Sequence, residues 1–295
     1  MRNSLILLLI PIAFAASWHV QMNDVPLDIL FTKDKILVVG LKGSIVVLDY
    51  KGNVLYKTFL KEEVRDADIY GKTFALLTQD KVVFLTLSGK KVMDFPINSN
   101  FAGSLKLVLP YLIAADKYIG LFYLDVLNGE LRLVWGLRGL TQVLPNSLIY
   151  FEDDGGKVLV ADAPGRVYLL RADGEVLGKV DFKGPVYSID YCGGKLAVGG
   201  DGFVKVIELK KPQLLLNRNI SGIALVSFED GCERLAVAVT SGKVLVFEGK
   251  RVTLNVTVTR PTALNWERGL LIVGSRDGTV TAFKVREEAK LPKIG

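Results

Sequence analysis

The chain has 295 residues, half of them hydrophobic, and a formal net charge of +6 at pH 7. This length suits one large domain or two small ones, with enough apolar side chains to bury a sizeable core. A single His and two Cys exclude a metal cluster built from these residue types, and the lack of a concentrated basic, aromatic stretch disfavours nucleic-acid binding.

Residues 1–16 have the pattern of a secretory signal peptide. Arg2 supplies a positive charge, an apolar run follows, and AFA at residues 13–15 has the small-x-small form of a cleavage site. The apolar run is short for a bilayer span, so the mature chain is expected to begin near Ala16 or Ser17 with no membrane span. The alternatives are a buried first strand or an uncleaved anchor. The signal predicts a secreted or cell-envelope protein.

From residue 36 onward the chain repeats. An apolar strand, a polar turn and an alternating strand recur seven times, as in LLIVGSRDGTVTAFKV at residues 270–285. The copies are spaced by 38, 38, 46, 38, 39 and 36 residues, and each can be divided into four short strands. A four-stranded unit of about 40 residues is typical of a propeller blade. The sequence therefore predicts an all-β, seven-bladed β-propeller of four-stranded blades over residues 17–286.

The last copy lacks an outer strand of its own. Its first three strands are expected at residues 262–267, 270–275 and 279–285, and the tail at residues 287–295 is a poor strand. Residues 17–22 resemble the outer strands of other copies, so we expect this N-terminal strand to close the ring and remove the open edges. The alternative is a C-terminal strand at residues 287–294.

Two stretches, GSRDGTVTAFKV and GGDGFVKVIEL, resemble blades of WD-repeat propellers, although the Trp-Asp and Gly-His residues of that family are absent. Two others, ADAPGRVYLLRADGEVLGKV and LFYLDVLNGELRLVW, are similar to quinoprotein-type (PQQ-like) blades. The resemblance implies a propeller and carries no activity across. Quinoprotein enzymes use adjacent Cys pairs on an eight-bladed ring, whereas Cys192 and Cys232 are 40 residues apart here.

Little in the sequence predicts catalysis. His19 lies just past the expected cleavage site and fits a strand better than a Ser-His-Asp triad. The acidic run EDD at residues 152–154 lacks EF-hand spacing and is interpreted as a solvated turn rather than a calcium site. The inner-strand candidates SLKLVL, LIYFED and IALVSFED contain few acids. No catalytic residue, metal or cofactor is predicted, and we do not expect an enzyme.

The spacing of 46 residues predicts a longer loop near residues 138–146, RGLTQVLPN, which is either a contact loop or a surface bulge. Export makes Asn219 and Asn255 candidate glycosylation acceptors, because each begins an Asn-x-Ser/Thr triplet. It also makes Cys192 and Cys232 candidate disulfide partners on turns of adjacent blades, with two free thiols as the alternative.

One surface feature follows from the repeat itself. The turns between the second and third strands of the blades are expected on one face of the ring, and six of the seven carry a cation. These residues are Lys42, Lys81, Lys117, Arg166, Lys243 and Arg276. The face either attracts an anionic partner or carries the charges of ordinary solvated turns.

The function favoured by the sequence is therefore an exported, non-enzymatic binding or scaffold module for a protein or an acidic surface polymer. The alternatives are a quinoprotein-type enzyme or cofactor-binding relative, and a structural part of a cell-surface complex. A fold alone does not decide among these classes. The sequence carries no prediction of the oligomeric state.

Overall fold

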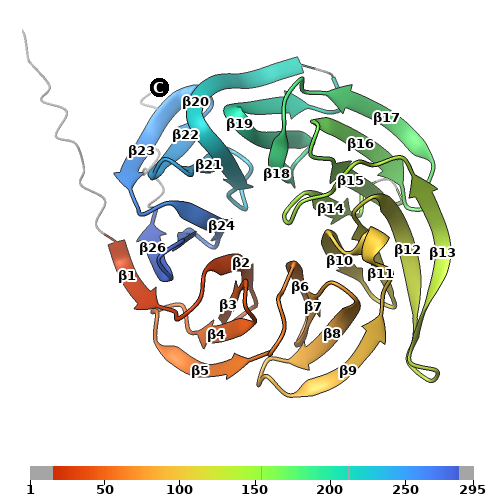
Figure 1. Ribbon diagram of the computed structural model, residues 1–295. Helices are drawn as coiled ribbons and strands as arrows, with labels where there is room; N and C mark the ends of the chain where they lie inside the picture. The colour runs from red at the N-terminus through yellow and green to blue at the C-terminus, as the bar shows by residue number, and fades with distance from the viewer. Residues whose placement is uncertain (1–15, 154, 212, 286–295) are drawn as a thin grey trace, which may run out of the picture.

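A computed structural model describes residues 16–153, 155–211 and 213–285. The protein is an all-β propeller, and Figure 1 shows its antiparallel sheets arranged around a central opening. In each four-stranded sheet one strand lies near the centre, and the other strands lie progressively further out. In the six-stranded sheet, β18 (Val186–Cys192) and the second half of β20 (Gln213–Phe228) both reach the centre. The helical content of the described part is a single 3-10 turn, η1 (Ser99–Phe101). No helix in these ranges is long and apolar enough to span a membrane.

Four sheets contain four strands that follow one another in the chain. The first two are β2 (Pro26–Phe31), β3 (Ile36–Gly40), β4 (Ser44–Leu48) and β5 (Val54–Phe59), then β6 (Asp66–Tyr70), β7 (Thr73–Leu77), β8 (Lys81–Thr86) and β9 (Lys91–Pro96). The next two are β10 (Ser104–Val108), β11 (Tyr111–Ala115), β12 (Tyr118–Asp125) and β13 (Glu130–Arg138), then β14 (Leu148–Phe151), β15 (Lys157–Ala161), β16 (Arg166–Arg171) and β17 (Val176–Asp181).

The two remaining sheets complete the propeller. One has six strands: β18 (Val186–Cys192), β19 (Lys195–Glu208), β20 (Gln213–Phe228), β21 (Arg234–Val239), β22 (Lys243–Glu248) and β23 (Arg251–Thr257). The other has the order β1-β26-β25-β24, with β24 (Pro261–Glu267), β25 (Leu270–Ser275), β26 (Thr279–Lys284) and β1 (Ala16–Gln21).

The predicted count of seven separate blades is wrong, because the described strands form six sheets. The fifth and sixth copies share the six-stranded sheet. The repeat pattern places the turn between the second and third strands of the GGDGFVKVIEL copy at Asp201, but β19 runs through this position and pairs first with β18 and then with β20. Asp201 lies opposite Ile223 of β20, which in turn continues into pairing with β21. Gly202 (φ +83°) and Gly222 (φ +113°) still bend the chain beside this pair, so the pair of Asp201 with Ile223 joins the two copies into one sheet without making the strands straight.

Hydrophobic clusters lie between neighbouring sheets and form the core. Ile29 and Val38 of the first sheet pack with Ile272 of the last one, and similar clusters follow around the ring. Because both faces of each sheet are covered, the central strands are apolar along their whole length, and β3 is buried at every position. Within the six-stranded sheet, Val204 of β19 and Val237 of β21 belong to one cluster.

The N-terminal strand lies beside the C-terminal part of the chain. β1 pairs antiparallel with β26 and forms the outer edge of that sheet (Figure 1). Trp18 of β1 donates from Nε1 to the Tyr50 carbonyl at 3.3 Å. Its ring covers Gly52, where a Cβ would lie 2.6 Å from the indole and where φ is +85°. A side chain at position 52 would therefore displace Trp18 and weaken the contact between β1 and the first sheet.

Candidate functional site

The six cations predicted to share a face all lie at the start of a third strand or in the turn before it. We call this set the basic edge: Lys42, Lys81, Lys117, Arg166, Lys243 and Arg276. Lys42, Lys117, Lys243 and Arg276 are exposed, and within the described ranges no acidic side chain forms an ion pair with any of them. These four come from four different hairpins, so their charges are spread around the ring.

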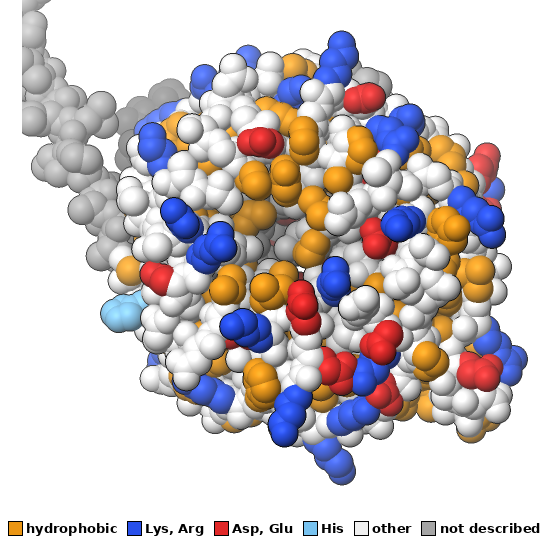
Figure 2. Space-filling model, viewed as in Figure 1, with side chains coloured by type: hydrophobic (Ala, Val, Ile, Leu, Met, Phe, Trp, Pro, Cys, Tyr) orange, Lys and Arg blue, Asp and Glu red, His pale blue; other side chains and the backbone are white. Residues whose placement is uncertain are grey.

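The other two members of the basic edge are already paired. Lys81 Nζ lies 2.6 Å from Glu62, and this hydrogen bond raises the pKa of Lys81 above its ordinary value. Arg166 forms an ion pair with the buried Asp162 and donates to Thr141 Oγ1 at 2.7 Å. Their charges are largely compensated, so they contribute less to the field of this face than the four exposed cations. Figure 2 shows one face of the molecule, with Lys and Arg mixed with Asp and Glu around a hollow centre.

The hollow centre belongs to a cavity of about 510 Å3, here called the axial cavity. Residues of the inner strands line it: β2, β6, β10, β14, β18, the second half of β20, and β24. Its lining includes six carboxylates and one amine, the amine being Lys106. This site was not predicted from the sequence, because the candidate inner strands SLKLVL, LIYFED and IALVSFED contain few acids.

Most of these polar groups connect one inner strand to the next. Asp66 accepts hydrogen bonds from Ser104 Oγ at 2.5 Å and from the Leu105 amide at 2.8 Å. Asp68 accepts from the Leu107 amide at 2.7 Å and lies 3.2 Å from Lys106 Nζ. Both carboxylates therefore join β6 to β10, and their first role is structural.

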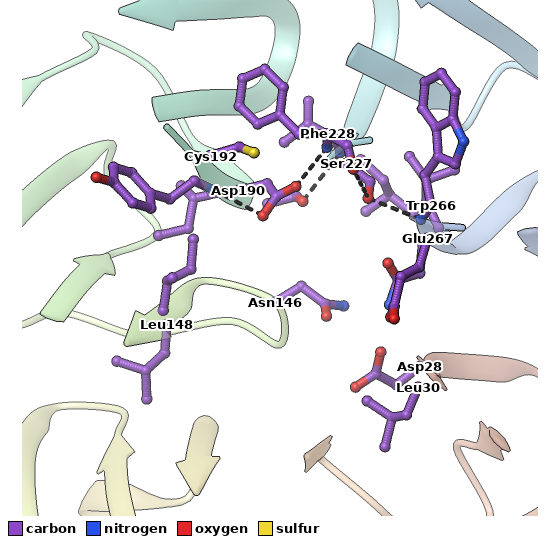
Figure 3. A pocket seen from close by; sticks show the side chains of 18 of the residues that line it. Asp28, Leu30, Asn146, Leu148, Asp190, Cys192, Ser227, Phe228, Trp266 and Glu267 are labelled. Carbon is purple, nitrogen blue, oxygen red and sulfur yellow. Dashed lines mark hydrogen bonds between the residues drawn. The ribbon is translucent and has the colours of Figure 1, made fainter. Parts of the chain in front are cut away.

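The same arrangement recurs across the six-stranded sheet (Figure 3). The Phe228 amide donates to Asp190 Oδ2 at 2.6 Å, and the Trp266 amide donates to Ser227 Oγ at 3.1 Å. Burial raises the pKa of Asp190 to about 6, and the hydrogen bonds from Phe228 and Tyr191 limit the rise. Inner-strand polar side chains thus replace the backbone hydrogen bonds that neighbouring sheets cannot form with each other.

Asp28 of β2 differs from these residues. It is 7% exposed, and among the described residues only the next amide, Ile29 N, donates to its carboxylate, at 2.7 Å. Asp28, Asp66 and Ser104 occupy the same position in three successive repeats, because each follows the one before by 38 residues. Asp28 therefore meets a carboxyl group where Asp66 meets a hydroxyl. Burial, followed by the charge of Asp66, raises the pKa of Asp28 to about 8.

Lys106 is the cation that offsets these acids. Burial alone would lower its pKa, but the charges of Asp68, Asp66 and Asp28 raise the pKa above the ordinary range of a lysine. Burial raises the pKa of Asp66 to about 6, opposed by Lys106 and by the hydrogen bond from Ser104. The amine therefore stays charged and serves several carboxyls at once, with its closest contact to Asp68.

The remaining predicted residues lie apart from the axial cavity, except Cys192 at its wall. Cys192 and Cys232 are joined in a disulfide, with Cα atoms 5.3 Å apart. Asn219 of β20 and Asn255 of β23 are both exposed on outer strand segments. His19 is exposed in β1, opposite Thr281. Residues 287–295 and the signal segment up to residue 15 lie outside the described residues.

The long loop predicted near residues 138–146 and the acidic run that begins at Glu152 both contact the rest of the protein. Between β13 and β14, Leu140 and Val143 are buried in the cluster that joins these sheets, so the long loop packs inward and is not a surface bulge. Of the acidic run, residue 154 lies outside the described residues, and Asp153 has a carboxylate that accepts from the Tyr191 hydroxyl at 2.7 Å. No group of three or more His, Cys, Asp or Glu within the described ranges is arranged to hold a metal ion.

Comparisons with known proteins support the architecture alone. No protein-family model and no curated protein matches the chain. The crystal structure of the computationally designed Ika8 protein is similar, with a TM-score of 0.65 and 16% identity over 90% of this chain and 98% of that chain. An identity this low shows a shared fold and nothing about activity. The chain is therefore established as a β-propeller whose function has to be argued from its own residues.

Proposed function

We propose that this chain is an exported, non-enzymatic propeller that binds an anionic partner, a protein or an acidic surface polymer, through the basic edge. The observation that carries the proposal is the exposure of Lys42, Lys117, Lys243 and Arg276 on one edge of the ring, without acidic partners among the described residues. Charges of one sign spread over a rigid face attract a partner of opposite charge and raise the rate of encounter.

Export is supported by two independent features. The first 16 residues have the signal-peptide pattern, and the disulfide between Cys192 and Cys232 is of a kind that persists in oxidising compartments. Within a secreted or envelope protein, exposed Asn219 and Asn255 would be accessible to a glycosylation enzyme.

The proposal includes a closed ring in which β1 joins the two ends of the chain. The two halves of the six-stranded sheet bury one shared cluster between them, as two separate blades would. The innermost strand β2 contacts β6 on one side and β24 on the other. Pairing of β1 with β26 adds a link between the chain ends. The strand and turn pattern of each repeat resembles the blades of WD-repeat and quinoprotein-type propellers. The proposed relationship to these families is limited to that pattern.

The test is a quadruple charge reversal, in which Lys42, Lys117, Lys243 and Arg276 are each replaced by Glu. All four side chains are exposed, so the melting temperature should change little. Retention on a dextran sulfate surface and on the isolated cell envelope should fall, most strongly at low salt, because exposed charges are screened as ionic strength rises.

The matched control reverses Lys33, Lys51, Lys72 and Lys250, which are exposed on the opposite edge. Lys195 is unsuitable for this control, because its Nζ donates to the Cys232 carbonyl at 2.8 Å. Equal retention of the two quadruple variants, or no loss in either, would show that the basic edge does not select an anionic partner.

A further inference from the structure

An open pocket of about 490 Å3 lies beside Lys42, a member of the basic edge. Two segments form its wall, the turn between β3 and β4 and the connection from β5 to β6. The pocket therefore lies where the chain passes from the first sheet to the second. We call it the rim pocket, and six residues line it: Leu41, Lys42, Phe59, Lys61, Glu62 and Glu63.

Backbone hydrogen bonds hold the two segments of the rim pocket together. The Leu60 amide donates to the Gly43 carbonyl at 2.8 Å, and the Val64 amide donates to the Leu41 carbonyl at 2.9 Å. A Cβ at Gly43 would lie 1.9 Å from the Leu60 carbonyl oxygen, so the close approach of the segments depends on glycine. The pocket is therefore formed before a ligand arrives, which lowers the entropic cost of binding.

Phe59 gives the rim pocket an apolar wall. This residue ends β5, the outermost strand of the first sheet, and its side chain is 56% exposed (Figure 1). Every other described phenylalanine is buried or half-buried. Phe59 pairs with Ser44 in the ladder between β4 and β5, which places it beside the turn that carries Lys42. Covering this ring with an apolar or aromatic group of a ligand is favourable.

Two amines of the rim pocket have no acidic partner. Within the described ranges, no carboxylate forms an ion pair with Lys42 or Lys61, and both side chains are exposed. Glu62 differs from them, because its carboxylate lies 2.6 Å from Lys81 Nζ. Glu63 is the one acid of the wall without a cation in the described chain. The unpaired charges are two amines and one carboxylate, and this balance favours an anionic group.

The connection from β5 to β6 also has free backbone donors. Among the described residues, no acceptor receives the amides of Lys61, Glu62 and Glu63, whereas the amides of Leu60 and Val64 on either side are bonded. Backbone amides bind carboxylate oxygens as lysine amines do, and such bonds are strengthened by the charge of the acceptor. The rim pocket therefore combines donors for an anion with an apolar wall.

We propose that the rim pocket binds a peptide segment in which an acidic side chain adjoins an aromatic one. Lys42, Lys61 and the free amides hold the carboxylate, and Phe59 packs against the aromatic ring. This inference rests on the proposed function, because Lys42 belongs to the basic edge, and it selects a protein rather than an acidic polymer as the partner. A sulfated polysaccharide carries charge but has no ring to cover Phe59.

Three capped tetrapeptides test whether charge and ring are both recognised: Asp-Phe-Asp-Gly, Asp-Ser-Asp-Gly without a ring, and Asn-Phe-Asn-Gly without charge. Each is titrated into the full chain and followed by calorimetry and by the NMR signals of Phe59. We expect saturable binding of Asp-Phe-Asp-Gly. The other two peptides should bind at least about threefold more weakly, because each lacks either the aromatic contact or the charge pair.

Phe59→Ser should weaken binding of Asp-Phe-Asp-Gly at least about threefold and should leave binding of Asp-Ser-Asp-Gly unchanged. The side chain is exposed at the end of an outer strand, so the melting temperature should change little. Leu177→Ser, at an exposed position of the outer strand β17, is the matched control and should bind both peptides like the unaltered protein.

Glu63→Gln tests the sign of the ligand charge. Removal of this unpaired acid should tighten binding of Asp-Phe-Asp-Gly about twofold, most clearly at low salt, because a repulsive charge is lost. A cationic ligand would instead bind more weakly to this variant. Asp34→Asn, at an exposed acid in the turn between β2 and β3, is the matched control and should have no effect.

Four results would each overturn the proposal: equal binding of Asp-Phe-Asp-Gly and either control peptide, unchanged binding by folded Phe59→Ser, weaker binding by Glu63→Gln, or no saturable binding of any peptide. If the peptides fail while the charge-reversed basic edge still loses retention on dextran sulfate, the proposed function stands and its partner is an acidic polymer. If the reversed basic edge keeps that retention while Phe59→Ser loses peptide binding, the proposed function fails and the rim pocket remains a peptide site.

Discussion

Asp28 and Asp190 are both inner-strand acids, yet they have different numbers of hydrogen-bond donors. Amides of Tyr191 and Phe228 both donate to Asp190, whereas Ile29 is the only donor to Asp28 within the described part of the chain. The pKa of Asp28 accordingly rises to about 8, and that of Asp190 to about 6, burial being the main cause in both. Hydrogen bonds to the ionised form therefore separate two carboxyls that share the same kind of environment.

The pH dependence of stability should report this difference. A carboxyl whose folded pKa is raised binds more protons in the folded state than in the unfolded state, so ionisation opposes folding. Stability contributed by protonated Asp28 should be complete below about pH 4 and should be lost as the pH rises through about 8. Asp28→Asn should therefore be more stable than the unaltered protein at pH 9, by about 2 kcal/mol.

Urea unfolding at several pH values between about 5 and 9 provides the measurement. Asp34→Asn serves as the control, because this exposed carboxyl should not alter the pH dependence. Parallel stability profiles for the unaltered protein and Asp28→Asn would contradict the assignment of a raised pKa to Asp28.

At the scale of elements, β1 contributes to two sheets at once. It pairs with β26, and Trp18 reaches across to the Tyr50 carbonyl of the first sheet. Met22, which follows β1, is 3% exposed and belongs to the cluster between the first and last sheets. The strand β1 therefore contacts both the first and the last sheet of the chain.

Deletion of residues 17–22 should consequently destabilise the protein by at least about 3 kcal/mol, or lower Tm by roughly 10 °C, through the loss of buried apolar area. Deletion of residues 287–295 is the comparison, and it should have a much smaller effect. Thermal unfolding followed by circular dichroism measures both. Similar losses of Tm in the two deletions would argue against β1 as the strand that joins the ends.

The repeat pattern predicted most strands but not how they join. β25 (Leu270–Ser275) has the predicted bounds, because its apolar run is bordered by turns on both sides. The chain bends at Gly202, next to Asp201, but β19 continues through the bend because Asp201 pairs with Ile223 of a distant strand segment. Turn residues such as Gly indicate where the chain can bend. They do not indicate whether a distant strand pairs beside the bend and joins two sheets into one.

The candidate site was predicted only in part. Four members of the basic edge are exposed as expected, but pairing of Lys81 with Glu62 joins residues from different connections and could not be predicted from turn positions. The polar residues of the inner strands could have been predicted from their spacing in the sequence. Asp28, Asp66 and Ser104 recur at intervals of 38 residues, at one position of the inner strands.

At the scale of the whole molecule, the described ends lie close together. Ala16 is opposite Phe283 in the ladder between β1 and β26. The repeat packing depends on contacts between neighbouring sheets and not on where the chain starts. A circular permutant is therefore expected to fold if its new ends are placed in an exposed turn.

We predict that a permutant joined from residue 285 to residue 16 and opened after Leu127 keeps a cooperative melt within a few degrees of the original. Leu127, in the turn between β12 and β13, is 97% exposed. Opening after Asp201 is the control and should cost far more stability, because it cuts the continuous strand β19. If the permutant opened after Leu127 is no more stable than the control, the packing of the repeats does depend on where the chain starts, and the prediction is wrong.

The pairing of β1 with β26 also has a consequence for the time course of folding. Gln21 and Thr279, which meet through their side chains, are 258 residues apart in the chain. Because 258 residues separate them, β1 must wait roughly 13 to 50 s for β26 to be synthesised at about 5–20 residues per second. During that interval the edge meant for β26 has no partner, and the last sheet cannot form. The last sheet therefore stays incomplete until nearly all of the described chain has been made.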